Sequence, residues 1–458
     1  MSVEVIEEKI SAKERYSFAF GALGKDLVYG ITATFAMIYF TDVLGVSASF
    51  IGLVFFVARF WDAINDLMCG VIVDNTRNKF GKFRTWLVIG TLSNAVVLAL
   101  MFTDFGFTGK SLYIYVAVTY VLWGMTYTLM DIPYWAMIPN FSKDRKEREK
   151  ISVLPRIFAS IGNTIIIGGL GIQIIDFLGN GNTGIGYSRF AYTIALVFVV
   201  TIGITVLNVK TPDRVASESV QVNKQEKLTF KGIKEILKKN DQFMAAIGVS
   251  LTYNCAMQLL ITTSVYYFFY VSGSKEMFAV FMSFSGIAGI SGLFIFPRLA
   301  SLTSRKKIYL YSAIFQISGM AMLFYTGIYY PQNSIITALA GVVINIGGGM
   351  MLGIITVTLA DVVDYGEYKL KKRSESIIFS AQTLLTKFTS AFGALLVGFV
   401  LDLTGYVPNA VQGPQTIFVL RILMCVAPVA FVIISYIIYN KKYILTREYM
   451  AKIYCHLN

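Results

Sequence analysis

The sequence predicts an all-helical integral membrane protein in which twelve spanning helices form two bundles of six. Of its 458 residues, 55% are apolar and only 15% are charged, and the mean hydropathy is +0.63. Soluble domains are on average about 25% charged. Long apolar runs alternate with polar segments, and a run of about 20 residues can cross a bilayer. Because backbone groups find no partner in lipid, each run is expected to be a helix.

The apolar runs fall into two sets of six, and we expect each set to form one bundle. The runs are 20–42, 49–74, 85–104, 112–138, 153–178, 190–209, 242–271, 276–299, 308–329, 334–360, 376–401 and 415–440. Residues 1–209 would form the N-terminal bundle and residues 242–458 the C-terminal bundle. The lysine-rich segment 210–241 would be a cytoplasmic loop between them. The first residues lack the apolar core of a cleavable signal peptide.

The distribution of basic residues predicts that both termini are cytoplasmic. With that orientation, most of the 40 Lys and Arg residues fall in cytoplasmic segments. Only Lys110, Arg189 and Lys275 would lie in segments outside the membrane on the far side. Such an asymmetry is typical of multi-pass membrane proteins.

Several function classes are disfavoured by what the chain contains. The net charge of +13 would indicate nucleic acid in a soluble protein, but here it follows membrane topology and no nucleic-acid partner is expected. The four cysteines lack pairing or metal-ligand spacing, so we expect neither a disulfide nor zinc. The only histidine, His456, lies in the C-terminal tail. With no nucleotide-binding loop either, an enzyme is not expected.

Charged side chains lie inside several apolar runs, which indicates transport or binding of ions or polar solutes. A charge at the bilayer centre costs from about 2.5 to more than 10 kcal/mol, so such residues are rare and usually functional. The acids are Asp26, Asp62, Asp66 and Asp131, and the bases are Lys25, Arg59, Arg156 and Lys387.

In the second run, Asp62 and Asp66 stand four residues apart and therefore share one helical face. Asn65 adds an amide, and Arg59 is placed to neutralise Asp62 in part. Oxygen ligands one turn apart suit a small cation such as Na⁺ or Li⁺, and two close carboxylates can equally share a proton. The structural alternative is a buried salt-bridge lattice that only holds helices together.

In the fourth run, Trp123, Tyr127, Asp131 and Trp135 recur every four residues and form an aromatic and acidic stripe. Carboxylates accept hydrogen bonds from sugar hydroxyls, and flat rings pack against a pyranose, so the stripe suits a carbohydrate site. Pro133 is expected to interrupt the helical hydrogen bonds near Asp131. A stripe that only packs against neighbours is the alternative, which we favour for Trp123.

Other charged residues extend this hypothesis to both halves. Lys25 and Asp26 are adjacent in the first run, Arg156 opens the fifth, and Lys387 follows Gln382 and Thr383 in the eleventh. Opposed charges near the cytoplasmic ends could close an inner gate, or could simply be solvated loop charges. The residues of this gate would be Arg145, Arg148 and Glu149 in the first half and Asp361, Asp364, Tyr365, Glu367, Lys369 and Arg373 in the second.

Long motifs spread over nearly the whole chain carry a family resemblance. The runs GALGKD, YFTDVLG, RFWDAIND, KFGKFRTWLVIGTL, LWGMTYTLMDIPYW, KEREK, LPRIFAS, DVVDYGEYKL and GYVPN resemble the glycoside–pentoside–hexuronide:cation symporters of the major facilitator superfamily, in particular the bacterial melibiose carriers. The resemblance implies alternating access and uptake of a sugar driven by Na⁺, Li⁺ or H⁺ across the bacterial cytoplasmic membrane. It implies no resident cofactor, and we expect a functional monomer.

The resemblance also implies roles for individual residues. The implied cation site consists of Asp62, Asn65, Asp66 and Thr128. The implied sugar site consists of Lys25, Asp26, Tyr127, Asp131, Trp135, Arg156, Gln382, Thr383 and Lys387. The implied cytoplasmic gate consists of Arg148, Glu149, Asp361, Asp364 and Arg373.

Three departures from the family pattern bear on the substrate. Leu352 replaces a tryptophan, Ala33 a tyrosine and Leu67 a proline. Losing two aromatic rings removes stacking surface from the pocket. A melibiose-like galactoside is still expected, but because of this loss another glycoside, a pentoside or a hexuronide stays open. A lipid carrier of the same fold and a sugar sensor that does not transport are further alternatives.

Overall fold

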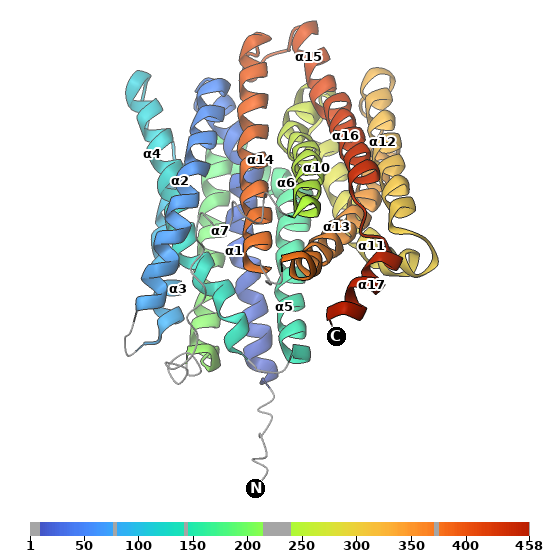
Figure 1. Cartoon of the computed structure of the whole chain (residues 1–458). Coiled ribbons are helices and arrows are strands. Elements are labelled where there is room, and N and C mark those ends of the chain that lie inside the picture. The colour runs from blue at the N-terminus through green and yellow to red at the C-terminus, as the bar shows by residue number, and fades with distance from the viewer. Residues whose placement is uncertain (1–9, 77–79, 142–144, 214–239, 371–374, 458) are drawn as a thin grey trace. The chain divides into compact units, whose positions relative to one another are not determined.

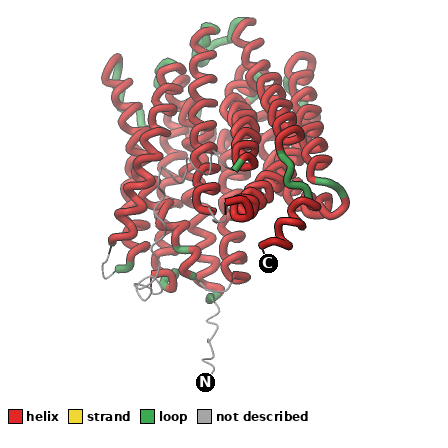
Figure 2. Tube along the Cα trace, in the orientation of Figure 1, coloured by secondary structure: helices red, strands yellow, loops and turns green. Residues whose placement is uncertain are grey.

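The computed structural model describes residues 10–76, 80–141, 145–213, 240–370 and 375–457. This part of the chain is helical with short connections and contains no strand (Figure 2). Because a helix pairs its own backbone groups, it is the element that long apolar runs require in lipid.

The chain divides into two compact units. Unit 1 comprises Met1–Val46 and Val57–Asn223, and unit 2 comprises Ser47–Phe56 and Lys224–Asn458. Long helices run alongside one another within each unit (Figure 1). The segment Ser47–Phe56 begins a helix whose remainder belongs to unit 1, so the unit boundary falls inside that helix.

Unit 1 holds the helices of the first half. They are α1 (Ala12–Ile38), η1 (Tyr39–Val43), α2 (Ala48–Asn75), α3 (Lys82–Met101), α4 (Gly109–Ala136), η2 (Ile138–Asn140), α5 (Arg145–Ser160), η3 (Ile161–Gly169), α6 (Gly171–Gly179) and α7 (Thr183–Asn208). η1 and η3 are π-helices and η2 is a 3-10 helix. α4 continues past Pro133 to Ala136, although proline has no N–H to donate to the helical ladder at this position.

Close packing places α1 against α7. Ser11 caps α1 by accepting a hydrogen bond from Glu14 N (3.2 Å). A Cβ added to Gly24 of α1 would lie 3.0 Å from the Cα of Phe198 and would also collide with Thr201, so only glycine allows this approach. The residue after this contact is Lys25, and the packing therefore fixes where its side chain begins.

The fifth predicted span is helical but not straight. The run 153–178 passes from α5 through the π-helix η3 into α6, with a bend of 54° between Val153–Gly169 and Gly171–Gly179. Insertions of π-type turns are rare and occur frequently at functional sites. Hydrophobicity alone did not reveal the bend, because the run is apolar on both sides of it.

Unit 2 holds the helices of the second half. They are α10 (Asp241–Tyr266), η4 (Tyr267–Val271), α11 (Lys275–Leu302), α12 (Arg305–Tyr329), α13 (Ser334–Leu370), α14 (Glu375–Leu403), α15 (Pro414–Arg421), η5 (Ile422–Val426), α16 (Ala427–Lys442) and α17 (Arg447–Leu457). Its core includes a stack of tyrosine rings, in which the ring centre of Tyr439 lies 4.3 Å from that of Tyr309 and 4.8 Å from that of Tyr443.

Unit 2 also includes the start of α2, which packs on α14. Both carboxylate oxygens of Asp402 accept hydrogen bonds there, from Ala48 N (3.2 Å) and Ser49 N (3.0 Å). The first amides of a helix have no partner within it, so Asp402 supplies what α2 lacks.

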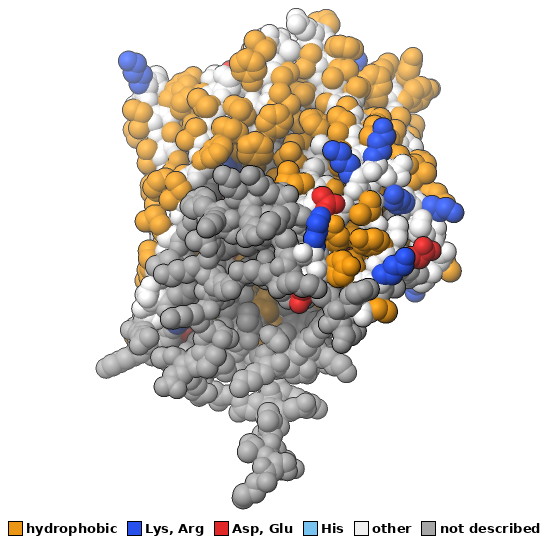
Figure 3. Space-filling view, in the orientation of Figure 1, with side chains coloured by type: hydrophobic (Ala, Val, Ile, Leu, Met, Phe, Trp, Pro, Cys, Tyr) orange, Lys and Arg blue, Asp and Glu red, His pale blue; other side chains and the backbone are white. Residues whose placement is uncertain are grey.

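The surface and the helix lengths fit a lipid environment. Within the described residues, ten helices are long and apolar enough to cross a membrane, and the bent pair makes eleven if it is one span. α1 is not among them, because Lys25 and Asp26 lower its mean hydropathy. Hydrophobic side chains cover most of the described face in Figure 3.

Candidate functional site

The centre of the candidate site in unit 1 is the ammonium group of Lys25. Its side chain is only 3% exposed, and its Nζ lies 3.2 Å from Asp26 Oδ2 and 2.8 Å from Asp131 Oδ1. Lys25 also donates a hydrogen bond to the hydroxyl of Tyr127 (3.4 Å). One cation on α1 thus joins two carboxylates from α1 and α4, which compensates much of the cost of burying them.

Aromatic rings surround the same ammonium group. Lys25 Nζ lies 4.8 Å from the ring centre of Trp135, 5.6 Å from that of Tyr134 and 5.8 Å from that of Tyr127. Rings at these distances attract a cation, and more strongly where water is excluded. Trp135 and Asp131 therefore both lie beside Lys25, which contacts aromatic rings as well as the acids.

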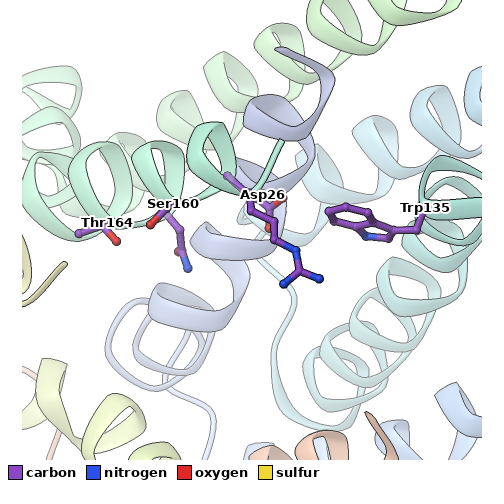
Figure 4. A pocket seen from close by; sticks show the side chains of 7 residues that line it. Asp26, Trp135, Ser160 and Thr164 are labelled. Atoms are coloured by element: carbon purple, nitrogen blue, oxygen red, sulfur yellow. The ribbon is translucent and has the colours of Figure 1, made fainter. Parts of the chain in front are cut away.

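A cavity of about 490 Å³ lies beside this group. It is lined by Asp26, Trp135, Arg156, Ala159, Ser160, Asn163 and Thr164. Figure 4 shows Asp26 between the ring of Trp135 on one side and Ser160 and Thr164 on the other. Arg156 is exposed and forms no ion pair with a described residue. Although Asp26 is paired with Lys25, it borders open space that a polar ligand could enter.

The predicted cation residues of α2 lie against α4. Asp62 is buried and its Oδ2 pairs with Arg59 Nη1 (3.1 Å), as expected. A Cβ added to Gly124 would lie 2.8 Å from Asp62 Oδ1. One turn further along each helix, Thr128 donates a hydrogen bond to Asp66 Oδ1 (3.2 Å). Both acids therefore face α4.

Asn65 lies between these acids and is also buried. Its Oδ1 accepts from Cys69 Sγ (3.6 Å), whereas its Nδ2 has no hydrogen-bond partner among the described residues. A buried amide without a partner is costly. The free group is a donor, so an acceptor atom of a ligand could satisfy it, whereas a cation could not. No cluster of acidic, cysteine or histidine ligands for a resident metal is found in the described residues.

α4 connects the two sets of residues. Tyr127 contacts Lys25, and the next residue, Thr128, contacts Asp66. Trp123 packs as predicted: it is 2% exposed and stacks on Tyr120 and Tyr127. A small rotation of α4 would therefore move partners of both acid groups together.

The predicted residues of the second half lie in unit 2. Gln382, Thr383 and Lys387 are on α14, where the Oε1 of Gln382 is buried and has no hydrogen-bond partner among the described residues. Leu352 on α13 is 54% exposed. The structure does not place these residues relative to the Lys25 group, so their sharing of one site stays a prediction.

Part of the predicted gate is described. Asp361 is buried and pairs with Arg305, and its Oδ2 accepts a hydrogen bond from Tyr443 (3.0 Å). Asp364 is half-buried on the same helix. The side chains of Arg148 and Glu149, and the whole of Arg373, lie outside the described residues.

Sequence reasoning missed functional candidates in both units. In unit 1 it missed Ser160, Asn163 and Thr164, although they follow Arg156 at steps of three and four residues that place them on one face. In unit 2 it missed Arg305 as the partner of Asp361, which is 56 residues away in sequence. No pattern in the chain indicates that second pairing.

Most of the chain is similar to known transport proteins. The family model described as MFS/sugar transport protein matches residues 17–447. The chain is 28% identical to the raffinose carrier protein of Pediococcus pentosaceus, over 97% of this chain and 71% of that protein. It is 25% identical to the isoprimeverose transporter of Lactiplantibacillus pentosus, over 88% of this chain and 83% of that protein.

Solved structures share the fold. A bacterial homologue of the human drug peptide transporters PepT1 and PepT2 matches with a TM-score of 0.67 and 13% identity, covering 97% of this chain and 99% of that one. The nucleoside transporter NupG matches with a TM-score of 0.63 and 15% identity, covering 94% of this chain and 100% of that one. At such identities the likeness is one of fold alone. The family model matches most of the length of this chain. The chain therefore belongs to the MFS/sugar transport protein family, whose members are transporters and not enzymes, and it is a multi-pass protein of the cell membrane.

Proposed function

We propose that this protein is a symporter that imports a sugar or glycoside together with Na⁺, Li⁺ or H⁺. The proposal includes twelve spans, both termini in the cytoplasm and alternating access in a monomer. The observation that carries it is the group of Lys25, Asp26 and Asp131 beside a cavity bordered by Trp135. Charge-assisted acceptors next to a flat ring are what a polyhydroxylated ring requires.

In the proposed binding mode, sugar hydroxyls donate to Asp26 and Asp131 and accept from Arg156, while one ring face packs on Trp135. The hydroxyls would share these carboxylates with Lys25, which holds the acids in place before the ligand arrives. Preorganisation of this kind lowers the ordering cost of binding.

In the proposed coupling, the cation binds near Asp62 and Asp66 and so biases α4. Since Thr128 contacts Asp66 and Tyr127 contacts Lys25, occupancy of one site changes the position of groups in the other. Coupling is reciprocal: a cation that raises sugar affinity must itself bind more tightly when sugar is present.

The substrate class is supported by the names of related proteins, since one relative is a raffinose carrier, one an isoprimeverose transporter and one, 28% identical from Lactobacillus delbrueckii subsp. bulgaricus, a lactose permease. We propose a galactoside of the melibiose type as the first substrate to test.

The test is binding calorimetry on the purified protein in detergent with Na⁺ present. Asp131→Asn keeps the shape of the side chain but removes its charge, and Asp26→Asn does the same on the other acid. Each should weaken sugar binding by ~10-fold or more, since hydrogen bonds to charged groups contribute about 1.5–3 kcal/mol. Unchanged affinity in both variants would remove these acids from the sugar site.

A further inference from the structure

The wall of the cavity beyond Arg156 is made by one face of α5 and η3. Ser160, Asn163 and Thr164 follow the arginine at helical spacing, and all of them line the cavity. In Figure 4, Ser160 and Thr164 lie on the side of Asp26 opposite to Trp135. The cavity therefore continues past the acid and ring that the proposed function uses for the first sugar unit.

The polar groups on this wall have unused hydrogen-bonding capacity. Elsewhere in unit 1, helical hydroxyls such as those of Thr32 and Thr126 donate to the carbonyl four residues earlier, the usual arrangement for such residues in a helix. Within the described residues, neither Thr164 nor Asn163 makes a side-chain hydrogen bond. A hydroxyl and an amide without protein partners, both on a cavity wall, are available to a ligand.

Asn163 is held where it is by the shape of α1. A Cβ added to Gly30 would lie 2.5 Å from Asn163 Oδ1, so the amide rests directly against a glycine of the neighbouring helix. The π-helix η3 begins at Ile161, just before this residue. The close contact with Gly30 restricts the positions that the amide can take.

We infer that Asn163 and Thr164 form a second subsite, which binds the second ring of a glycoside whose first ring is held at Asp26, Trp135 and Arg156. This inference rests on the proposed function and specifies its substrate as at least a disaccharide. The wall is neutral and offers both donors and acceptors, which suits the hydroxyls of a sugar ring. A cavity of about 490 Å³ is within the usual range of about 300–1,000 Å³ for small-molecule sites.

The experiment compares sugars that differ by one ring. Binding of galactose is measured against melibiose and lactose, and binding of xylose against isoprimeverose, by calorimetry on the purified full chain with Na⁺ present. The variants are Thr164→Val, which removes the hydroxyl while keeping the shape, and Asn163→Ala. Thr193→Val is the matched control, because Thr193 lies on α7, away from the cavity wall, and its hydroxyl donates to Arg189 O within that helix (2.9 Å).

The expected result is selective. Each subsite variant should weaken binding of the disaccharides by ~2- to 10-fold, the effect of one lost hydrogen bond, and should leave the monosaccharides unchanged. The control should alter neither. Equal losses for both sizes of sugar, or no loss for disaccharides, would overturn the subsite while leaving the sugar site in place. If the unsubstituted protein binds none of these sugars, the proposed function fails and the subsite fails with it.

Discussion

Lys25 forms ion pairs with two carboxylates, and this pairing explains how α1 can hold charged side chains in an apolar environment. Asp26 and Asp131 are 23% and 29% exposed, whereas Lys25 is 3% exposed, so the cation is enclosed while both acids stay partly accessible. A buried charge without a partner would cost several kcal/mol. The arrangement leaves the acids with one side for Lys25 and another for a ligand.

A prediction at this scale concerns Asp66. Asp66→Asn can still accept the hydrogen bond from Thr128 but cannot attract a cation by charge. In the unsubstituted protein, Na⁺ or Li⁺ should raise sugar affinity by ~5- to 150-fold, the usual range of coupling. In the variant, the effect should fall below ~2-fold. Sugar titrations by calorimetry at several salt concentrations measure this directly.

The control for that experiment is Asp104→Asn. Asp104 lies in an exposed turn and accepts from Gly106 N (2.8 Å), so its loss should leave the cation effect intact. A full Na⁺ response in Asp66→Asn would contradict a role of Asp66 in coupling.

Among the helices, α1 depends on glycine to approach α7. Gly24→Ala would place a methyl group against the backbone of Phe198 and the side chain of Thr201. Overpacking of this kind typically costs about 1–3 kcal/mol, and here it would also displace Lys25. We expect a lower melting temperature in detergent and weaker sugar binding.

Gly203→Ala on α7 is the matched control, because an added Cβ there meets no atom within 4 Å. It should keep both the melting temperature and the sugar affinity. Equal behaviour of the two variants would show that close packing at Gly24 is not needed.

The start of α3 depends on a carboxyl group from the segment after α7. Asp213 Oδ1 accepts a hydrogen bond from Phe83 N (2.7 Å). Burial raises the pKa of the Asp213 carboxyl above its ordinary value, although the backbone hydrogen bonds oppose the shift. The folded state therefore binds this proton more tightly than the unfolded state does. The stability that the bound proton contributes is lost as pH rises from about 4 through the raised pKa.

Asp213→Asn replaces the carboxyl by a neutral group that can still accept the hydrogen bond. The melting temperature of the variant relative to the unsubstituted protein should therefore increase as pH rises from about 4 to 7. Melting curves in detergent at several pH values test this. A difference that does not vary with pH, or that changes in the opposite direction, would contradict the assignment.

The sequence predicted helices well because lipid permits few alternatives, and it predicted pairs well where partners are close in sequence. Arg59 with Asp62 is such a pair, three residues apart on one helix. It could not predict that Lys25 reaches Asp131 on another helix, because the contact depends on how α1 packs on α4. Asn163 and Thr164 were missed because neutral polar residues in an apolar run carry no signal of depth or direction.

The bend in the fifth span and the division of α2 between units were also beyond sequence reasoning. Both arise from packing: η3 is a π-helix within an apolar run, and the start of α2 is held by Asp402 of α14. Hydrophobic periodicity reports which residues face lipid or core, but it does not report which helix lies beside which.

For the whole molecule, we propose that Asp26 of α1 and Asp131 of α4 bind the sugar. Asp62 and Asp66 of α2 bind the cation, and α4 contacts both sets of residues. The most direct measurement is uptake of labelled melibiose, lactose and isoprimeverose into proteoliposomes, with an inward gradient of Na⁺, Li⁺ or H⁺ or with none. The account predicts accumulation above the external concentration only with a gradient, and none in Asp131→Asn. Accumulation that ignores every gradient, or that persists unchanged in this variant, would contradict it.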